Sequence, residues 1–400
     1  MPKPFLPAFA DLSQDIAGEI PVGIIEDWIQ SDGSAEAHAR ILASFERRGT
    51  FVSSDSAGLS KLALGKSLIE VMKLVSQPKE IIHALGTAIG GQAVGIWIAD
   101  NTQMFYPSSV PVEHVVRQML AVQNEASKCL VKVGLGIHVG VVYEIGGGLY
   151  GADADDVEHA TEEESKAGEV MVSKAVKGII GESFTVDNER AGYDILKRSP
   201  GDSPIKHGTN NRYPAPFDAK FFDELQMLDL TNKESVAELE RARLQARTVV
   251  LLRVFHAPEE LLLNTLTKGV STNSLMNNVL KRYDCNLINM NGSLMIVTLE
   301  KPAEAVDLAL ALHETARENE LTANVGVVAG DVLIFDLGHG KEQIAGSPVN
   351  VASKLAEDTD ERNAVFLESS VAEHAPQHGL TSAFTVSKSG VELTGIRVSF

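Results

Sequence analysis

Residues 136–140 read Gly-Ile-His-Val-Gly, and residues 326–330 read Gly-Val-Val-Ala-Gly. A glycine-rich stretch follows each pentapeptide and leads to a further glycine, Gly151 in the first case and Gly346 in the second. The two copies lie a whole domain apart, far more than the roughly 20 to 50 residues of a solenoid repeat. The repetition therefore predicts two like domains in one chain.

The sequence around the first pentapeptide alternates between strand-like and helix-like patterns. The second copy has the same order, with a helix at 235–246 leading into a strand at 249–252. This alternation favours an α+β fold, in which each copy has one mixed sheet with helices packed on one face. In the first copy we expect strands at 50–54, 93–98, 103–106, 131–139 and 169–172, and helices at 65–76, 79–89, 111–128 and 153–166.

The domain organisation follows from these repeats and from one stretch of turn residues. Residues 199–216 are rich in Ser, Pro and Gly, which indicates a linker. Such a linker would let the copies pair within one chain or between the chains of a homodimer. We expect an N-terminal helical segment at 1–45, a first domain at 46–195, a linker and helix at 196–246, and a second domain at 247–400.

Composition excludes several classes of protein. The 400 residues carry a formal net charge of −19, which argues against a nucleic-acid-binding or anionic-membrane surface. The two cysteines exclude a disulfide framework and a cysteine-based zinc site. No apolar run is long enough to span a bilayer, and the N-terminus lacks the pattern of a secretory signal. We therefore expect a cytoplasmic protein without a membrane span.

Two carboxylates are placed where a metal–phosphate site could form. Asp55 follows a strand and precedes a turn at Gly58, while Asp100 ends or interrupts the strand at 93–98. Hard cations such as Mg²⁺ bind carboxylates and phosphate oxygens, and a glycine turn before a helix can cradle phosphate. An aspartate before a glycine is also common turn chemistry, so the residues alone leave both interpretations open.

Several motifs in this order resemble the catalytic domains of class III nucleotidyl cyclases. The resemblance implies two degenerate, ferredoxin-like α/β sandwich domains in tandem, which form a pseudo-dimer. It covers most of the chain, although no single motif in it is specific. The matching segments are Asp55 to Ser60, Ala99-Asp100, the Gly-Ile-His-Val-Gly strand at 136–140, Gly168 to Ser173, and Gly346 to Lys354, where Lys replaces the family's Arg.

In such cyclases one domain supplies two metal-binding aspartates, and its partner supplies the groups that hold the ribose and phosphates. The resemblance therefore implies a composite site that uses Mg²⁺ or Mn²⁺, two ions in all, on a nucleoside triphosphate. It assigns the metals to Asp55 and Asp100, nucleotide contacts to Gly58, Leu59 and Ser60, the ribose to Asn350, and phosphate charge to Lys354.

This composite site departs from the family pattern at four positions. Ile288 and Gln343 stand where adenine-specific members carry Lys and Asp. Thr394 stands where a C-terminal Lys often contacts phosphate. Lys354 keeps a positive charge but lacks the bidentate guanidinium. We therefore expect weak contacts to the base and the phosphates.

The opposite combination of half-sites gives a degenerate second site. Its metal positions fall on Arg253 and on Gly292 or a neighbouring residue, neither of which is a Mg²⁺ ligand. Its other two positions fall on Asp155 and His159, within an acidic run. Because like charge repels a triphosphate, we expect this site to be inactive.

Two functions stay open. In the first, the chain is an active cyclase, a phosphorus–oxygen lyase that makes a 3′,5′-cyclic nucleotide for signal transduction. In the second, it is a pseudoenzyme that binds a nucleotide such as ATP or GTP, or a regulatory protein partner, without turnover. Fold alone does not separate these functions.

Overall fold

The structure is a computed structural model, and it describes residues 9–11, 19–59, 62, 65–97, 101–145, 148–257, 259, 261–338, 341–375, 380–388 and 391–399. The chain divides into two compact units. We call Ala39–Val236 the first unit, and Ala237–Phe400 together with Glu19–His38 the second unit.

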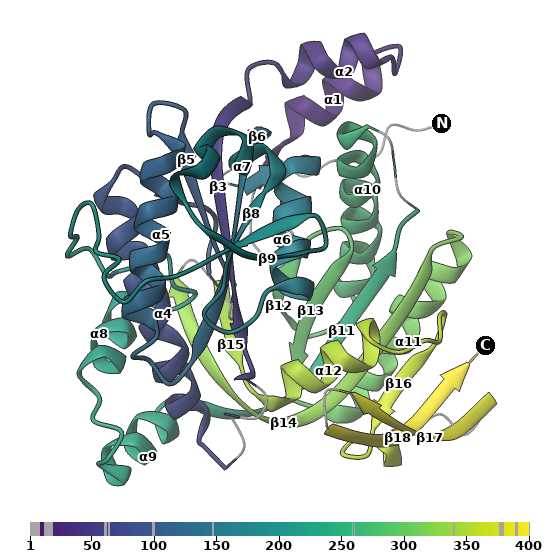
Figure 1. Cartoon of the computed structure of the whole chain (residues 1–400). Helices are drawn as coiled ribbons and strands as arrows, with labels where there is room; N and C mark the ends of the chain where they lie inside the picture. Colours follow the sequence, from purple (N-terminus) through teal and green to yellow (C-terminus); the bar gives the residue numbers. More distant parts are fainter. Residues whose placement is uncertain are drawn as a thin grey trace. The chain divides into compact units, whose positions relative to one another are not determined.

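The first unit is built on a mixed sheet (Figure 1). Among its described residues the strand order is β4-β5-β3-β6-β8-β10-β9, and β7 pairs with β6. All of these neighbours are antiparallel except β6 and β8, which are parallel. The strands are β3 (Glu46–Ala57), β4 (Gln92–Ala93), β5 (Thr102–Pro107), β6 (Lys132–Ile145), β7 (Gly148–Tyr150), β8 (Val170–Ser173), β9 (Val186–Arg190) and β10 (Tyr193–Leu196).

The second unit repeats this topology strand for strand. Its order is β12-β13-β11-β14-β16-β18-β17, with β15 paired to β14 and a parallel pair at β14 and β16. Two like α+β domains were predicted, and this repetition confirms them. The strands are β11 (Leu244–Phe255), β12 (Asn286–Met290), β13 (Leu294–Leu299), β14 (Thr322–Gly338), β15 (Lys341–Ala345), β16 (Val365–Glu368), β17 (Leu380–Lys388) and β18 (Val391–Ser399).

Helices cover the sheets and link their strands. A short hairpin of β1 (Phe9–Asp11) and β2 (Glu19–Pro21) precedes the first helix. The helices are α1 (Val22–Gln30), α2 (Ala35–Leu42), α4 (Leu68–Ala88), α5 (Val112–Ala126), α6 (Ala152–Glu164), α7 (Lys174–Ile180), α8 (Ala219–Met227), α9 (Lys233–Arg241), α10 (Leu262–Leu280), α11 (Pro302–Glu318) and α12 (Ser347–Glu357).

Helices pack on both faces of the second unit's sheet, whereas the sequence predicted one face. On β11, Val250 and Leu252 pack with residues of α10 and α11. Their neighbours Val249 and Leu251 pack with residues of α12 on the opposite face. The cause is the unbroken apolar run along β11, because a strand without polar alternation buries both of its faces.

The repeated pentapeptides begin with glycine because a helix lies directly on each strand. A Cβ atom at Gly136 would lie 2.1 Å from Thr161 Oγ1 of α6. A Cβ atom at Gly326 would lie 2.4 Å from the backbone oxygen of Ala352 in α12. Neither site leaves room for a side chain, so the two glycines preserve the same helix–strand contact in both units.

Helix α4 is continuous, so the prediction of separate helices at 65–76 and 79–89 was wrong. Pro78 lies inside the helix. A proline removes one helical hydrogen bond, but the buried side chains of Leu74 and Ile82 hold the turns on either side of it. The helix begins at a capping box, in which Ser67 Oγ accepts from the Glu70 amide and Glu70 Oε2 accepts from the Ser67 amide.

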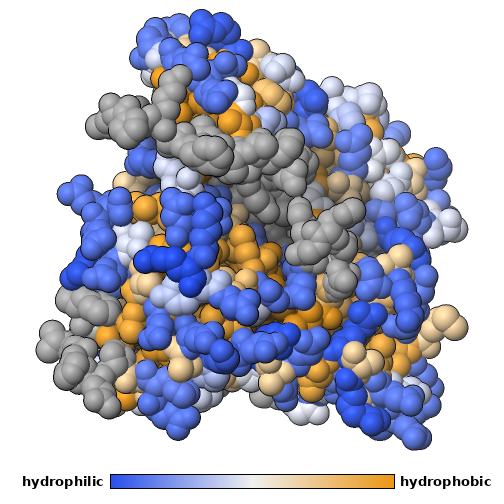
Figure 2. Space-filling model, turned by 180° about the vertical axis from the view of Figure 1, so that it is seen from behind, coloured by the Kyte–Doolittle hydropathy of each residue, from blue (hydrophilic) through white to orange (hydrophobic). Residues whose placement is uncertain are grey.

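The acidic residues that the structure describes are exposed or half-buried, with one exception. Of the aspartates and glutamates that the structure describes, Asp194 is the buried one. Figure 2 shows one face of the molecule, where hydrophilic residues alternate with smaller apolar areas. Within the described ranges, no helix is long and apolar enough to cross a membrane.

Candidate functional site

Strand register places Asp55 and Arg253 at equivalent positions in the two units. Asp55 of β3 pairs with Gly134 of β6, two residues from the pentapeptide glycine of that strand. Arg253 of β11 pairs with Asn324 of β14, again two residues from the pentapeptide glycine. The same sheet position therefore carries an acid in the first unit and a base in the second.

Asp55 lies half-buried near the end of β3. Three residues later the chain turns at Gly58, whose φ of +75° is a conformation that favours glycine. Leu59 is half-buried beyond this turn, while Ser60 and Asp100 lie outside the described residues. Beside Asp55, Ser54 Oγ lies 2.6 Å from Thr102 Oγ1, which ties β3 to β5.

The C-terminal end of α6 lies over the Asp55 end of the sheet. A Cβ atom at Gly134, the partner of Asp55, would lie 2.0 Å from Ser165 Oγ, just past α6. Asn101, which follows Asp100 in the chain, donates a hydrogen bond to the Glu162 carboxylate of α6. Glu162 thus lies beside Asn101, a contact that the sequence analysis did not predict.

The N-cap glycines of α6 and α12 show which residues of these two helices are equivalent. Gly151 precedes α6 with a φ of +120°, and Gly346 precedes α12 with a φ of +157°. Because both helices start after equivalent glycines, their residues can be matched by counting. The count pairs Asp155 with Asn350, His159 with Lys354, and Glu162 with Glu357.

The second unit carries an ion pair at the metal position. Arg253 Nη1 lies 3.5 Å from Glu357 Oε1, and both side chains are about one-third exposed. Their counterparts in the first unit are Asp55 and Glu162, which are both acidic. The guanidinium therefore offsets the negative charge of Glu357 within the second unit itself.

The other metal position of the second unit also lacks a carboxylate. Gln103 and Ile296 are equivalent, because each pairs with the residue two positions before Asp55 or Arg253. Three residues earlier in each copy, Ser293 corresponds to Asp100, and Ser293 is next to Gly292. Gly292 is buried, its amide donates to Asn273 Oδ1 at 2.7 Å, and its carbonyl accepts from His256 Nε2 at 2.9 Å. This turn is held by hydrogen bonds between protein groups.

The second unit's residues at the expected nucleotide-contact positions lie on four of its elements. Asn350 is exposed and Lys354 is half-buried, one helical turn apart on α12. Ile288 on β12 and Gln343 on β15 are both half-buried. Their strands lie side by side, because Asn286 Nδ2 of β12 donates to Glu342 Oε2 of β15 at 2.9 Å. Thr394 on β18 is exposed and pairs with Thr385 of β17.

The degenerate positions of the first unit are at its surface. Asp155 and His159 are exposed on α6, as expected for an acidic, solvated helix start. Across the part of the chain that the structure describes, no three His, Cys, Asp or Glu side chains are grouped to hold a metal ion. The oxygen donors Asp55 and Glu162 suit Mg²⁺ or Mn²⁺ in chemical type, since hard cations prefer carboxylates.

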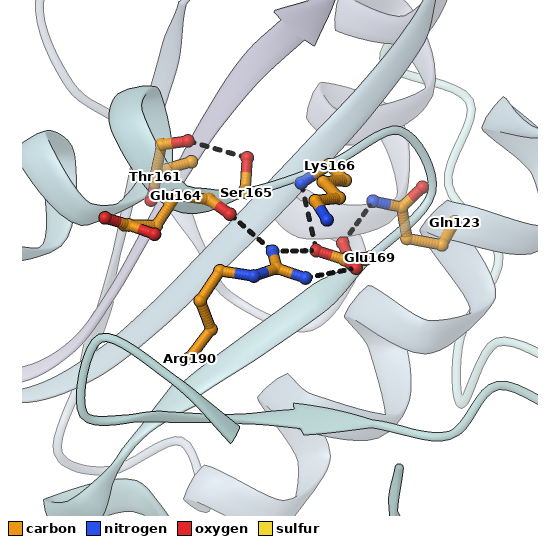
Figure 3. Close-up of polar contacts among 7 residues, drawn as sticks. All are labelled: Gln123, Thr161, Glu164, Ser165, Lys166, Glu169 and Arg190. Carbon is orange, nitrogen blue, oxygen red and sulfur yellow. Dashed lines mark hydrogen bonds and ion pairs between the residues drawn. The ribbon is translucent and has the colours of Figure 1, made fainter. Parts of the chain in front are cut away.

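Glu169, in the matching segment Gly168 to Ser173, stabilises the structure through an ion pair (Figure 3). Arg190 of β9 binds Glu169 through two parallel hydrogen bonds, Nη1 to Oε2 at 2.7 Å and Nη2 to Oε1 at 3.0 Å. Arg190 Nη1 also donates to the Glu164 carbonyl at the end of α6. The hydrogen bond from Arg190 lowers the pKa of Glu169. This pair fixes the end of α6, and with it the helix that carries Glu162.

No protein-family model matches the chain, and no curated protein matches it. Solved structures do match. A class III adenylyl cyclase-like ATP-binding protein from Pseudomonas aeruginosa is 11% identical, with a TM-score of 0.52 over 83% of this chain and 85% of that chain.

Two further structures match a smaller part of the chain. The adenylyl cyclase CyaB from P. aeruginosa is 14% identical, with a TM-score of 0.35 over 39% of this chain and 97% of that one. The guanylate cyclase domain of RhGC from Catenaria anguillulae, solved with GTP, is 16% identical, with a TM-score of 0.33 over 39% and 96%.

The likeness to the P. aeruginosa ATP-binding protein extends over most of both chains. It confirms the predicted fold, that of class III cyclase-type domains, and at 11% identity it shows the fold alone.

Proposed function

We propose that this chain is a class III nucleotidyl cyclase homologue that forms a 3′,5′-cyclic nucleotide from a nucleoside triphosphate. The observation that carries the proposal is the charge difference between the units. The second unit has the Arg253–Glu357 ion pair, whereas the first has Asp55 and Glu162 at the same two positions. Two acids placed in this way favour a divalent cation, and a cation favours triphosphate.

In this proposal Asp55 and Asp100 hold Mg²⁺ or Mn²⁺, which when bound stabilise negative charge on phosphate oxygens. The amide of Asn350 orients the ribose, and the ammonium of Lys354 offsets charge on the phosphates. The ribose 3′-oxygen attacks the α-phosphorus, the bond to the β-phosphate bridging oxygen breaks, and pyrophosphate leaves. The proton of the 3′-hydroxyl passes to solvent.

A second candidate is nucleotide binding without turnover, by a pseudoenzyme. The residues at 288, 343, 354 and 394 favour it, because each differs from what the cyclase resemblance implies. A lysine in place of arginine loses the bidentate grip on phosphate, which weakens stabilisation of the transition state. In this case the chain would act through a regulatory partner rather than through a product.

The test is a mass-spectrometric search for cyclic nucleotide after incubation with ATP, GTP, CTP or UTP and Mn²⁺. The variant Asp55→Ala removes the proposed metal ligand. Asp187→Ala changes an exposed aspartate on β9 and serves as the matched control.

Product that is lost in Asp55→Ala and kept in Asp187→Ala supports the cyclase. Metal-dependent nucleotide binding without product supports the second candidate. Product formation at the wild-type rate in Asp55→Ala contradicts the proposed site.

A further inference from the structure

The first unit has a cavity of about 630 Å³ on one face of its sheet, beside the start of α5. Its lining includes Arg48 and Thr50 of β3 and Val139 and Val141 of β6, which are alternate residues of each strand. Because side chains alternate along a strand, all four point to the same face, where the start of α5 and Ile179 of α7 complete the lining. The volume lies within the range of small-molecule binding sites.

A longer connection before α5 helps to form this cavity. Tyr106 of β5 and Leu299 of β13 are equivalent, because they pair with equivalent threonines of β3 and β11. Six residues lead from Tyr106 to Val112, the first residue of α5, whereas three lead from Leu299 to Pro302, the first residue of α11. The connection in the first unit is therefore three residues longer, and Val110 within it lines the cavity.

The second unit is polar at the equivalent place. The residue after the last glycine of the pentapeptide is Val141 in the first unit and Asp331, which is exposed, in the second. The residue before that glycine is Val139 in the first unit and Ala329 in the second, where its amide donates to Ser370 Oγ at 3.0 Å. The apolar lining is thus a property of the first unit and not a requirement of the shared fold.

The β3 side of the cavity has hydrogen-bonding groups without a partner. Thr50 is 1% exposed and lines the cavity, and its hydroxyl makes no hydrogen bond within the described part of the chain. The N-cap of α5 is Pro111, whose side chain cannot accept from the first amides of the helix. Those amides carry the positive end of the helix dipole. Since a buried hydroxyl without a partner costs free energy, a ligand that binds it is favoured.

Arg48 adds a full positive charge on this side. Its side chain is 69% exposed, and its Nη2 lies 2.9 Å from Glu46 Oε1, in an ion pair that contributes little because solvent screens it. His114 of α5 also lines the cavity, and Glu113 is the acid among the lining residues. The charged groups at the cavity are therefore few, and they include one of each sign that can be removed separately.

The β6 side of the cavity is apolar. Val139 and Val141 are half-buried, and Ile179 of α7 is 54% exposed, so each leaves apolar surface in contact with water. A ligand with an apolar chain would cover this surface, which is favourable in proportion to the area removed from water.

We propose that this cavity binds a small carboxylate with an apolar chain. The carboxylate accepts hydrogen bonds from the Thr50 hydroxyl and from the amides at the start of α5, while Arg48 offsets its charge. The chain lies against Val141 and Ile179. The site goes beyond the proposed function, because none of its lining residues is assigned to the metal ions or the nucleotide.

The test is calorimetric titration of the full chain with three probes of equal chain length: octanoate, octylamine and 1-octanol. Octanoate should bind at least about tenfold more tightly than either of the others, because it alone matches both the helix amides and the guanidinium.

Three substitutions test the two sides of the cavity. Val141→Asp introduces the residue of the second unit and should weaken octanoate binding at least about tenfold, because it adds a negative charge to the apolar side. Arg48→Gln should weaken the binding about threefold, and Glu113→Gln should strengthen it about threefold. Arg47→Gln is the control, because Arg47 points to the other face, where its Nε lies 3.0 Å from Glu144 Oε2.

Thr50→Val separates binding from stability. Valine keeps the shape of the side chain and removes the hydroxyl, so octanoate binding should weaken about fivefold. The melting temperature should stay the same or rise, because the hydroxyl that is removed has no partner in the free protein. A purely structural role of Thr50 would instead lower the melting temperature.

Octanoate binding with opposite effects of Arg48→Gln and Glu113→Gln supports the site. The absence of octanoate binding, or binding that Val141→Asp leaves unchanged, overturns it. Octylamine or 1-octanol bound as tightly as octanoate overturns the assignment of a carboxylate. A chain that forms no cyclic nucleotide leaves all of these results unaffected, so the inference and the proposed function fail separately.

Discussion

Arg253 of β11 and Glu357 of α12 form an ion pair at the place where the other unit has two acids, Asp55 and Glu162. Strand register and helix caps fix this equivalence without any appeal to sequence identity. The two copies therefore keep one architecture, and at this pair of positions they differ in the sign of one charge. That sign separates a position that could bind metal from one whose charge the chain itself balances.

Exchanging the charges of the pair in the second unit should be tolerated, although reversing one of them should not. Arg253→Glu places two acids side by side and should lower the free energy of unfolding by about 1 kcal/mol, the scale of a partly exposed ion pair. The double variant Arg253→Glu with Glu357→Arg should recover most of this loss. Urea unfolding measures both, and equal stability of single and double variants would contradict a direct interaction.

Removing the charge of Glu162 should weaken metal binding in the first unit. Glu162→Gln keeps the shape and a hydrogen-bond acceptor for Asn101 but removes one negative charge. We expect the dissociation constant for Mn²⁺ to rise roughly three- to tenfold, since one charge near a cation contributes about 1 kcal/mol in a solvated site. Glu163→Gln changes the adjacent exposed residue and is the control. Equal effects of the two variants would reduce Glu162 to one of many surface charges.

Replacing Lys354 should change turnover more than binding if the chain is a cyclase. Lys354→Arg restores a planar group that can bind phosphate through two hydrogen bonds. Because that charge acts on the phosphates as pyrophosphate leaves, kcat should rise by about tenfold with a small change in KM. Lys354→Met should lower kcat instead. A pseudoenzyme would show no product with either variant.

The Glu169–Arg190 pair predicts a pH dependence of stability. Arg190 lowers the pKa of Glu169 in the folded chain below the ordinary value of 4.5. The stabilisation is therefore present above that value and is lost as the pH falls through the folded pKa. Arg190→Gln should lower the free energy of unfolding by about 2 kcal/mol at pH 7, and the deficit should shrink below pH 4.5.

Urea titrations of both proteins between pH 7 and pH 3 would measure this difference. Arg247→Gln, whose nearest acid is Glu300 at 3.8 Å, provides the control for loss of an arginine. A deficit that stayed constant down to pH 3 would show that Arg190 acts by packing alone.

Much of the fold could be predicted because local patterns and repetition agree. The paired pentapeptides predicted two domains, and the apolar periodicity of α5 and α6 placed these helices within a few residues of their bounds. Pro78 was misjudged because buried contacts on both sides outweigh one lost hydrogen bond. Such contacts join residues far apart in sequence, and no local pattern reveals them.

The candidate site was only partly visible in the sequence. Asp55 stood out by its glycine turn, whereas Glu162 was hidden within a run of acids that is typical of a solvated helix. The position of Glu162 was recognised from the equivalent residue in the second unit, Glu357, which forms an ion pair with Arg253. The packing of residues 205–214 against α4 and α5 was equally hidden, because turn-rich composition predicts a linker but does not indicate whether that linker packs against a helix.

The contacts of residues 205–214 also limit where this chain can be divided. A fragment that ended at residue 195, where the repeated sequence stops, would lack the partners of Ser76, His83 and Trp97. Lys73 Nζ binds the Gln226 carbonyl at 2.8 Å, so the intact module extends through α8. The first unit thus needs more residues than the part that is recognisably repeated, and its separate expression should succeed only when residues through α8 are included.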